Sequence, residues 1–287
     1  MGYDYDNLCR DVNMITENYG EVEKSIIGKS VMGRDIICLK AGGGKKSIVL
    51  LGAYHGLEYL TSAFLIKFIL DYTANAAVGG KYFGYSAAEL FKNVTLYVIP
   101  MVNPDGVDIA VNGLDITNPF HRKLISMAGI HSFNSVWQAN ANGVDLNHNH
   151  NADWSMVMER PSPSKFGGEY AQSEPEVKAV VDFVRENDCD MLLSFHSQGR
   201  EIYYDFGGFA PEGAEEKAKQ LAGVSGYAAA IPKGTAAFGG CKDWFISEFG
   251  RMGFTVEMGS GKNPLPMEQI DEIYEENAKL VLCAMSD

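Results

Sequence analysis

Short apolar runs alternate with longer amphipathic stretches along the chain. Runs rich in β-branched and aromatic residues predict strands, whereas stretches with apolar residues three and four apart predict helices. The predicted strands are 36–39, 47–51, 95–100, 191–195, 201–205 and 254–258, and the predicted helices are 60–72, 174–186, 213–223, 243–249 and 267–283. This alternation predicts an α/β fold in which a mixed, largely parallel, twisted sheet of about eight strands carries helices on both faces. No linker divides the chain, so we expect a single domain over residues 1–287.

The segment 103–168 interrupts this alternation. It is rich in Asn, Gly, Pro and Ser, and it opens on Asn103-Pro104-Asp105-Gly106, which predicts a turn after the strand 95–100. Loops of this length are uncommon in compact proteins unless they serve a function. We therefore expect this segment to form loops that bind a ligand.

Polar side chains follow several of the predicted strands. His55 and Glu58 come just after the run 47–51, His196 follows the run 191–195, and Glu257 lies at the end of the run 254–257. In α/β sheets, ligands bind at the carboxyl ends of the strands. Two histidines and one carboxylate, with a fourth position left for water, are typical of a catalytic zinc site. The sequence therefore predicts one Zn²⁺ ion per chain, held by His55, Glu58 and His196.

Composition and charge limit the classes of molecule that the protein is expected to bind. The chain of 287 residues holds 24 Lys and Arg against 37 Asp and Glu, a formal charge of −13, which disfavours binding to nucleic acid or to anionic membranes. No apolar run reaches the length of a bilayer span, and the N-terminal residues lack the features of a secretory signal. The five cysteines show no Cys-x-x-Cys pairing. These features together predict a cytoplasmic protein and leave its oligomeric state open.

The motifs quoted above, taken in order, resemble those of the zinc carboxypeptidases of peptidase family M14. The resemblance covers nearly the whole chain and includes the segments 27–36, 55–58, 103–106, 143–149, 166–168, 173–176, 196–199, 239–244 and 255–257. It implies the carboxypeptidase-like (phosphorylase/hydrolase-like) fold, cleavage of peptide bonds, and zinc ligands at His55, Glu58 and His196. It also implies that Glu257 is the general base, which accepts a proton from water and passes it to the leaving amine.

The chain departs from the digestive enzymes of that family where the substrate binds. His148 stands where those enzymes have the arginine that clamps a C-terminal carboxylate, and Gln138 stands where they have an oxyanion-stabilising arginine. Thr235 stands in the place of their mobile tyrosine. Arg122, Lys123 or Arg200 could supply the missing positive charge. The predicted substrate-binding residues are Asn147, His148, Gln138, Thr235 and Arg200.

These departures resemble a bacterial branch of the family, the γ-D-glutamyl-meso-diaminopimelate peptidases. The Asn-His-Asn sequence at 147–149 and the Asn-Pro-Leu-Pro sequence at 263–266 occur in that branch as well. The resemblance implies a murein peptide as substrate, cleaved between γ-D-glutamate and diaminopimelate. Three alternatives stay open: a carboxypeptidase of broad specificity, a zinc deacylase or amidohydrolase of small N-acyl amino acids, and a pseudo-enzyme that binds peptide without turnover.

Overall fold

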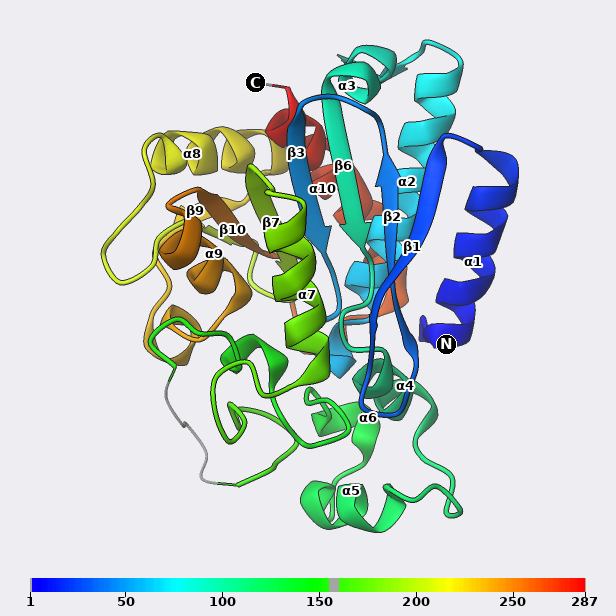
Figure 1. Cartoon of the computed structure of the whole chain (residues 1–287), viewed down its shortest axis with the longest axis vertical. Helices are drawn as coiled ribbons and strands as arrows, with labels where there is room; N and C mark the ends of the chain where they lie inside the picture. The colour runs from blue at the N-terminus through cyan, green and yellow to red at the C-terminus, as the bar shows by residue number, and fades with distance from the viewer. Residues whose placement is uncertain (1, 155–159, 287) are drawn as a thin grey trace.

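An eight-stranded sheet forms the centre of the molecule (Figure 1). A computed structural model describes residues 2–154 and 160–286 of the chain. The strands follow the order β1-β2-β6-β3-β7-β10-β8-β9, and a separate two-stranded ribbon pairs β4 with β5. Their bounds are β1 Val22–Lys29, β2 Asp35–Ala41, β3 Lys46–Leu51, β4 Lys81–Tyr82, β5 Tyr85–Ser86, β6 Val94–Ile99, β7 Met191–His196, β8 Glu201–Tyr203, β9 Ala228–Ala230 and β10 Met252–Glu257.

The middle of the sheet is parallel and its flanks are mixed. The strands β6, β3, β7 and β10 run parallel to one another, while β1, β2 and β8 pair antiparallel with their inner neighbours. This arrangement confirms the predicted mixed α/β sheet. Because parallel strands end at the same edge, the residues that follow β3, β7 and β10 are brought together there.

Helices cover both faces of the sheet (Figure 1). Along β2, Ile37 and Leu39 belong to one apolar core and Ile36 and Cys38 to the other, as the period of two in a strand requires. Burial of each isoleucine or leucine among them stabilises the fold by about 1.5–3 kcal/mol. The first core is closed by α1 Tyr5–Asn18, α2 Leu60–Ala77, α3 Ala87–Asn93, α8 Ala214–Ser225 and α10 Ile270–Met285, and the second by α7 Pro175–Glu186 and α9 Cys241–Phe249.

The segment 103–168 is more ordered than its composition predicts. It contains the helices α4 Pro104–Asn112, α5 His121–Ala128 and α6 Phe133–Val136, so the prediction of a long loop was wrong for these parts. The apparent turn at Asn103 is the start of α4, because the Asn103 side chain accepts a hydrogen bond from Gly106 N at 2.9 Å and Pro104 occupies the first helical turn. Residues 155–159 of this segment lie outside the described ranges.

Across residues 2–154 and 160–286, none of the helices combines the length and the apolar composition needed to cross a membrane.

Candidate metal centre

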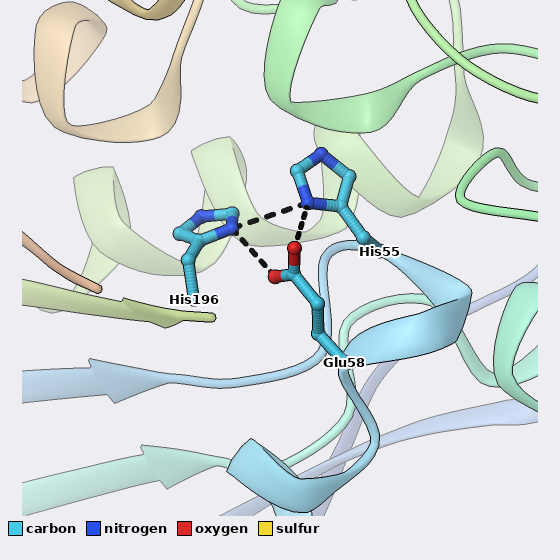
Figure 2. Close-up of side chains that lie close together, drawn as sticks. All are labelled: His55, Glu58 and His196. Atoms are coloured by element: carbon cyan, nitrogen blue, oxygen red, sulfur yellow. Dashed lines mark hydrogen bonds and ion pairs between the residues drawn. The ribbon is translucent and has the colours of Figure 1, made fainter. Parts of the chain in front are cut away.

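Three side chains meet at the carboxyl edge of the sheet (Figure 2). His55 Nδ1 lies 2.9 Å from Glu58 Oε1, and His196 Nδ1 lies 3.0 Å from Glu58 Oε2. The two Nδ1 atoms are 3.3 Å apart. The structure thus brings together the three residues that the sequence predicts as zinc ligands, with one ligand atom from each within 4.8 Å of the others.

The backbone explains the His-x-x-Glu spacing. After β3, the chain turns through Ala53, whose φ is 46°, and enters a 3₁₀ turn at Gly56–Glu58. Side chains three residues apart lie one above the other in such a turn, so His55 and Glu58 face the same point. His196 is the last residue of β7, the parallel neighbour of β3, and reaches that point from the next strand.

Gly56 allows the turn to lie close to the neighbouring loops. A Cβ atom at this position would lie 2.3 Å from Gly106 O, and the Gly56 N–H donates to Gln138 O at 3.0 Å. Asn103 supports the same region, because its amide donates to Tyr54 O and to Gln138 O. Asn103 is fully buried and does not line the cleft described below, so its role here is structural.

Further polar groups hold the three side chains in place. His55 Nε2 lies 3.1 Å from Asp145 Oδ1, and His196 Nε2 lies 3.1 Å from Ser194 Oγ. Asn263 donates to Glu58 Oε1 at 3.2 Å. When the outer nitrogen of a histidine donates its hydrogen to a partner, the inner nitrogen keeps a lone pair for a metal. Asn263 is the first residue of the Asn-Pro-Leu-Pro segment, which therefore has a direct contact with this cluster.

The donor set fits zinc. Two imidazole nitrogens and a carboxylate are the ligands of catalytic zinc sites, and both outer ring nitrogens are already occupied here. Burial alone would raise the pKa of Glu58, but His55 and His196 lower it to about 2, so the carboxylate is ionised. Burial disfavours the charged form of His55, yet Glu58 and Asp145 raise its pKa well above the usual range. Because a metal binds the neutral imidazole, metal binding at His55 is coupled to the protonation of its ring.

Glu257 lies beside this cluster. It ends β10 and pairs in register with His196 on β7, so both side chains lie on the same face of neighbouring strands. Burial, followed by the charges of Glu58 and Glu201, raises the pKa of Glu257 to about 8, and His55 partly opposes this. A divalent cation bound beside it would favour the ionised form again.

A cleft opens over the cluster, and it contains four of the five predicted substrate-binding residues. The cleft is lined by His55, Gln138, Asp145, Asn147, His148, Lys165, His196, Tyr203, Thr235, Ala236, Phe238, Gly240, Asp243, Thr255 and Glu257. Asn147 Oδ1 accepts a hydrogen bond from Cys241 N at 3.1 Å, which leaves both of its amide hydrogens for a ligand. His148 Nδ1 is buried and has no hydrogen-bond partner within the described residues.

Arg200 does not reach the cleft. Its guanidinium lies 2.7 Å from Glu276 Oε1 and packs over the ring of Tyr227. Only its backbone adjoins the site, where Arg200 N donates to Glu257 O. Acidic residues of α10 hold the Arg200 side chain outside the described lining of the cleft, and the contact of Arg200 with substrate stays a prediction. Neither Arg122 nor Lys123 lines the cleft either.

Asp145, Lys165 and Tyr203 are not among the predicted site residues. Asp145 orients His55, and Lys165 and Tyr203 line the cleft. Asp145 belongs to the Gly-Val-Asp-Leu-Asn loop that the sequence highlights, so its carboxylate could have been assigned. Tyr203 provides a hydroxyl in the cleft, although that group donates to Glu201 Oε2 at 2.6 Å. Nothing in the local sequence indicates Lys165.

Known proteins resemble this chain over nearly its whole length. The family model for zinc carboxypeptidase, peptidase M14, matches residues 10–280. γ-D-Glutamyl-L-diamino acid endopeptidase 1 of Lysinibacillus sphaericus is 34% identical over 287 residues, which cover 99% of this chain and 72% of that protein. Human carboxypeptidase B is 28% identical over 285 residues, which cover 91% of this chain and 64% of that protein.

Solved structures share the fold. The thrombin activatable fibrinolysis inhibitor superposes with a TM-score of 0.81 at 22% identity, covering 100% of this chain and 74% of that one. The murein-tripeptide amidase of Escherichia coli O157 superposes with a TM-score of 0.57 at 19% identity, covering 90% and 91%. Together with the match of the family model and the bacterial endopeptidase, these findings show that the chain belongs to the zinc carboxypeptidase family, peptidase M14, whose members hydrolyse peptide bonds.

Proposed function

We propose that this protein is a zinc peptidase that cleaves the amide between γ-D-glutamate and meso-diaminopimelate in murein peptides. The observation that carries the proposal is a cleft with the zinc ligand set and Glu257 but with no arginine among its described lining residues. Arginine is the side chain that clamps a carboxylate with two parallel hydrogen bonds. The similarity to the γ-D-glutamyl-L-diamino acid endopeptidase, at 34% identity, supports the same substrate class.

The residues of the cleft have distinct roles in this reaction. Zinc held by His55, Glu58 and His196 would make a water molecule more acidic and polarise the scissile carbonyl. The Glu257 carboxylate accepts the proton of that water and delivers it to the nitrogen of the leaving diamino acid. The Gln138 amide, which lines the cleft, donates a neutral hydrogen bond to the carbonyl oxygen as charge develops on it.

The test compares two substrates with two forms of the enzyme. The zinc-loaded protein and its Glu257→Gln variant are each incubated with L-Ala-γ-D-Glu-meso-diaminopimelate and with an ordinary α-linked peptide of the same length. Products are identified by mass spectrometry. We expect the unmodified protein to release diaminopimelate from the γ-linked peptide, and we expect the variant to be slower by about 10²–10⁴-fold.

Each of the other outcomes would indicate a different function. Cleavage of the α-linked peptide alone would indicate a general metallocarboxypeptidase and would refute the murein assignment. Turnover of neither peptide, together with binding of the γ-linked one, would indicate a pseudo-enzyme. Turnover of small N-acyl amino acids instead of either peptide would indicate a deacylase.

A further inference from the structure

One cation in the cleft has no role in the mechanism above. Lys165 is the sole lysine or arginine among the described residues that line the cleft. Asp243, which also lines it, is already neutralised by a buried ion pair with Lys242. Asp145 is likewise in contact with His55. Lys165 is therefore the positive charge that remains for a ligand.

The backbone holds Lys165 at a defined place. Its N–H donates to Asp145 Oδ2 at 2.9 Å, and the other oxygen of Asp145 contacts His55. The Asp145 N–H in turn donates to Phe166 O at 2.8 Å. Lys165 also has a φ of 68°, a left-handed conformation that residues with a Cβ rarely adopt. Two hydrogen bonds therefore connect a candidate zinc ligand to the backbone of this lysine.

The Lys165 ammonium is available to bind a ligand. The residue is exposed, and within residues 2–154 and 160–286 its side chain has no ion-pair or hydrogen-bond partner. Its surroundings are acidic, since the chain carries a formal charge of −13 and Glu257 and Asp145 line the same cleft. A negatively charged substrate would be repelled there unless a local cation attracted it.

We propose that Lys165 binds a carboxylate of the substrate beside the scissile amide and thereby determines specificity. This inference rests on the proposed function. A γ-linked glutamyl peptide keeps the free α-carboxylate of glutamate on one side of the scissile amide, and diaminopimelate carries two carboxylates on the other side. A lysine ammonium offers three donors and a full charge to such a group, which the neutral Gln138 amide does not.

The experiment combines enzyme variants with amidated substrates. Lys165→Met removes the charge and keeps much of the aliphatic side chain, whereas Lys165→Arg keeps the charge. The control is Lys92→Met, which makes the same change of net charge on α3, outside the cleft. Each enzyme is assayed with the γ-linked tripeptide and with two forms of it, one amidated at the glutamate α-carboxylate and one at the diaminopimelate carboxylates. Both kcat and KM are measured, together with zinc content.

Lys165→Met should lower kcat/KM for the carboxylated tripeptide by about 10–100-fold, mainly through KM, with zinc content unchanged. The wild type should prefer the carboxylated tripeptide over one of its two amidated forms, and Lys165→Met should lose this preference. The amidated form that shows the effect identifies the carboxylate that Lys165 binds. Lys165→Arg should retain that preference, and Lys92→Met should behave as wild type. Calorimetry on zinc-loaded Glu257→Gln should show that the tripeptide binds more weakly as salt rises, and that adding Lys165→Met removes most of this dependence.

Two failures are distinguishable. If the wild type cleaves none of the γ-linked substrates, the proposed function fails. If the wild type cleaves the tripeptide but Lys165→Met keeps both its rate and its preference for the carboxylate, the role of Lys165 is refuted while the proposed function stands. A wild type that treats carboxylated and amidated substrates alike would also refute it.

Discussion

The metal side and the substrate side of the cleft differ in how their polar side chains are satisfied. On the metal side, His55 contacts both Glu58 and Asp145, and His196 contacts both Glu58 and Ser194. Every ring nitrogen of the two histidines therefore has a partner. Such support fixes the rings before any ligand arrives, which is what a metal site requires.

On the substrate side, two polar groups that line the cleft lack partners within the described residues. Within residues 2–154 and 160–286, His148 Nδ1 is buried without a hydrogen bond, and no ion pair involves the Lys165 ammonium. A buried unsatisfied group costs about 1–3 kcal/mol, which a ligand can offset by binding to it. The difference indicates that the protein itself completes the metal side, whereas the substrate completes the other side.

The largest test of this contrast separates zinc binding from proton transfer. Glu257→Gln should lower kcat by about 10²–10⁴-fold and keep zinc, because Glu257 is not a ligand in this assignment. Glu58→Gln should abolish activity as well, but with loss of zinc, because a neutral amide replaces the charged ligand. Zinc content by atomic emission and kcat on the γ-linked peptide distinguish the two. Equal zinc loss in both variants would contradict the assignment of Glu257 as the base.

A second test concerns Glu176, a buried carboxylate that packs behind the loop containing Asp145. Glu176, at the start of α7, is fully buried; its carboxylate accepts hydrogen bonds from Val31 N and from Asn140, which precedes Asp145 in the same loop. Burial raises the pKa of Glu176 from 4.5 to about 7, partly opposed by these hydrogen bonds. The pKa of Glu176 is higher in the folded protein than in the unfolded chain, so its protonated form favours folding. This contribution to the free energy of unfolding is complete below pH 4.5 and is lost as pH rises through 7.

The expected loss reaches about 3 kcal/mol between these pH values. Glu176→Gln cannot ionise, so its free energy of unfolding should lack this slope. Urea denaturation at pH 5 and at pH 8 measures the difference. Glu186→Gln, an exposed change on the same helix, is the matched control and should keep the slope of the wild type. Parallel pH profiles for Glu176→Gln and the wild type would refute a raised pKa at Glu176.

A third test weakens the metal side without removing a ligand. The two oxygens of Asp145 each accept a hydrogen bond, one from His55 and one from Lys165 N. In Asp145→Asn only one acceptor remains, so one contact is lost and zinc affinity should fall by about 10–100-fold. Competition with a chelator measures this affinity. The control is Asp190→Asn, because this exposed aspartate accepts a hydrogen bond from Ser47 N at the other end of β3. It should leave the zinc affinity unchanged.

The sequence predicted the metal side better than the substrate side for a physical reason. Buried parallel strands appear as apolar runs, and their polar ends mark His55, His196 and Glu257. The substrate side is built from loops whose conformation depends on distant contacts, such as the one between Lys165 N and Asp145. A left-handed φ at a lysine leaves no trace in the local sequence.

The same reasoning explains the elements that the sequence did not reveal. Most residues of β1 are exposed, so the strand lacks the alternation that would mark it. The start of α4 looks like a turn because Asn and Pro favour both turns and helix starts, and Gly106 adds to that impression. Arg200 follows the zinc-ligand motif in sequence, yet Glu276 on the distant helix α10 decides where its side chain lies.

The smallest expected effect is at His148, and it sharpens the contrast with Lys165. The resemblance puts His148 in the place of a carboxylate-clamping arginine, but an imidazole cannot form the two parallel hydrogen bonds that a guanidinium gives to a carboxylate. A single bond of this kind contributes about 0.5–1.5 kcal/mol, so His148→Ala should raise KM by roughly 2–10-fold and leave kcat nearly unchanged. His131→Ala, at an exposed histidine outside the cleft, is the control. If His148→Ala weakened binding more than Lys165→Met did, the main contact with the substrate carboxylate would belong to the imidazole and not to the Lys165 ammonium.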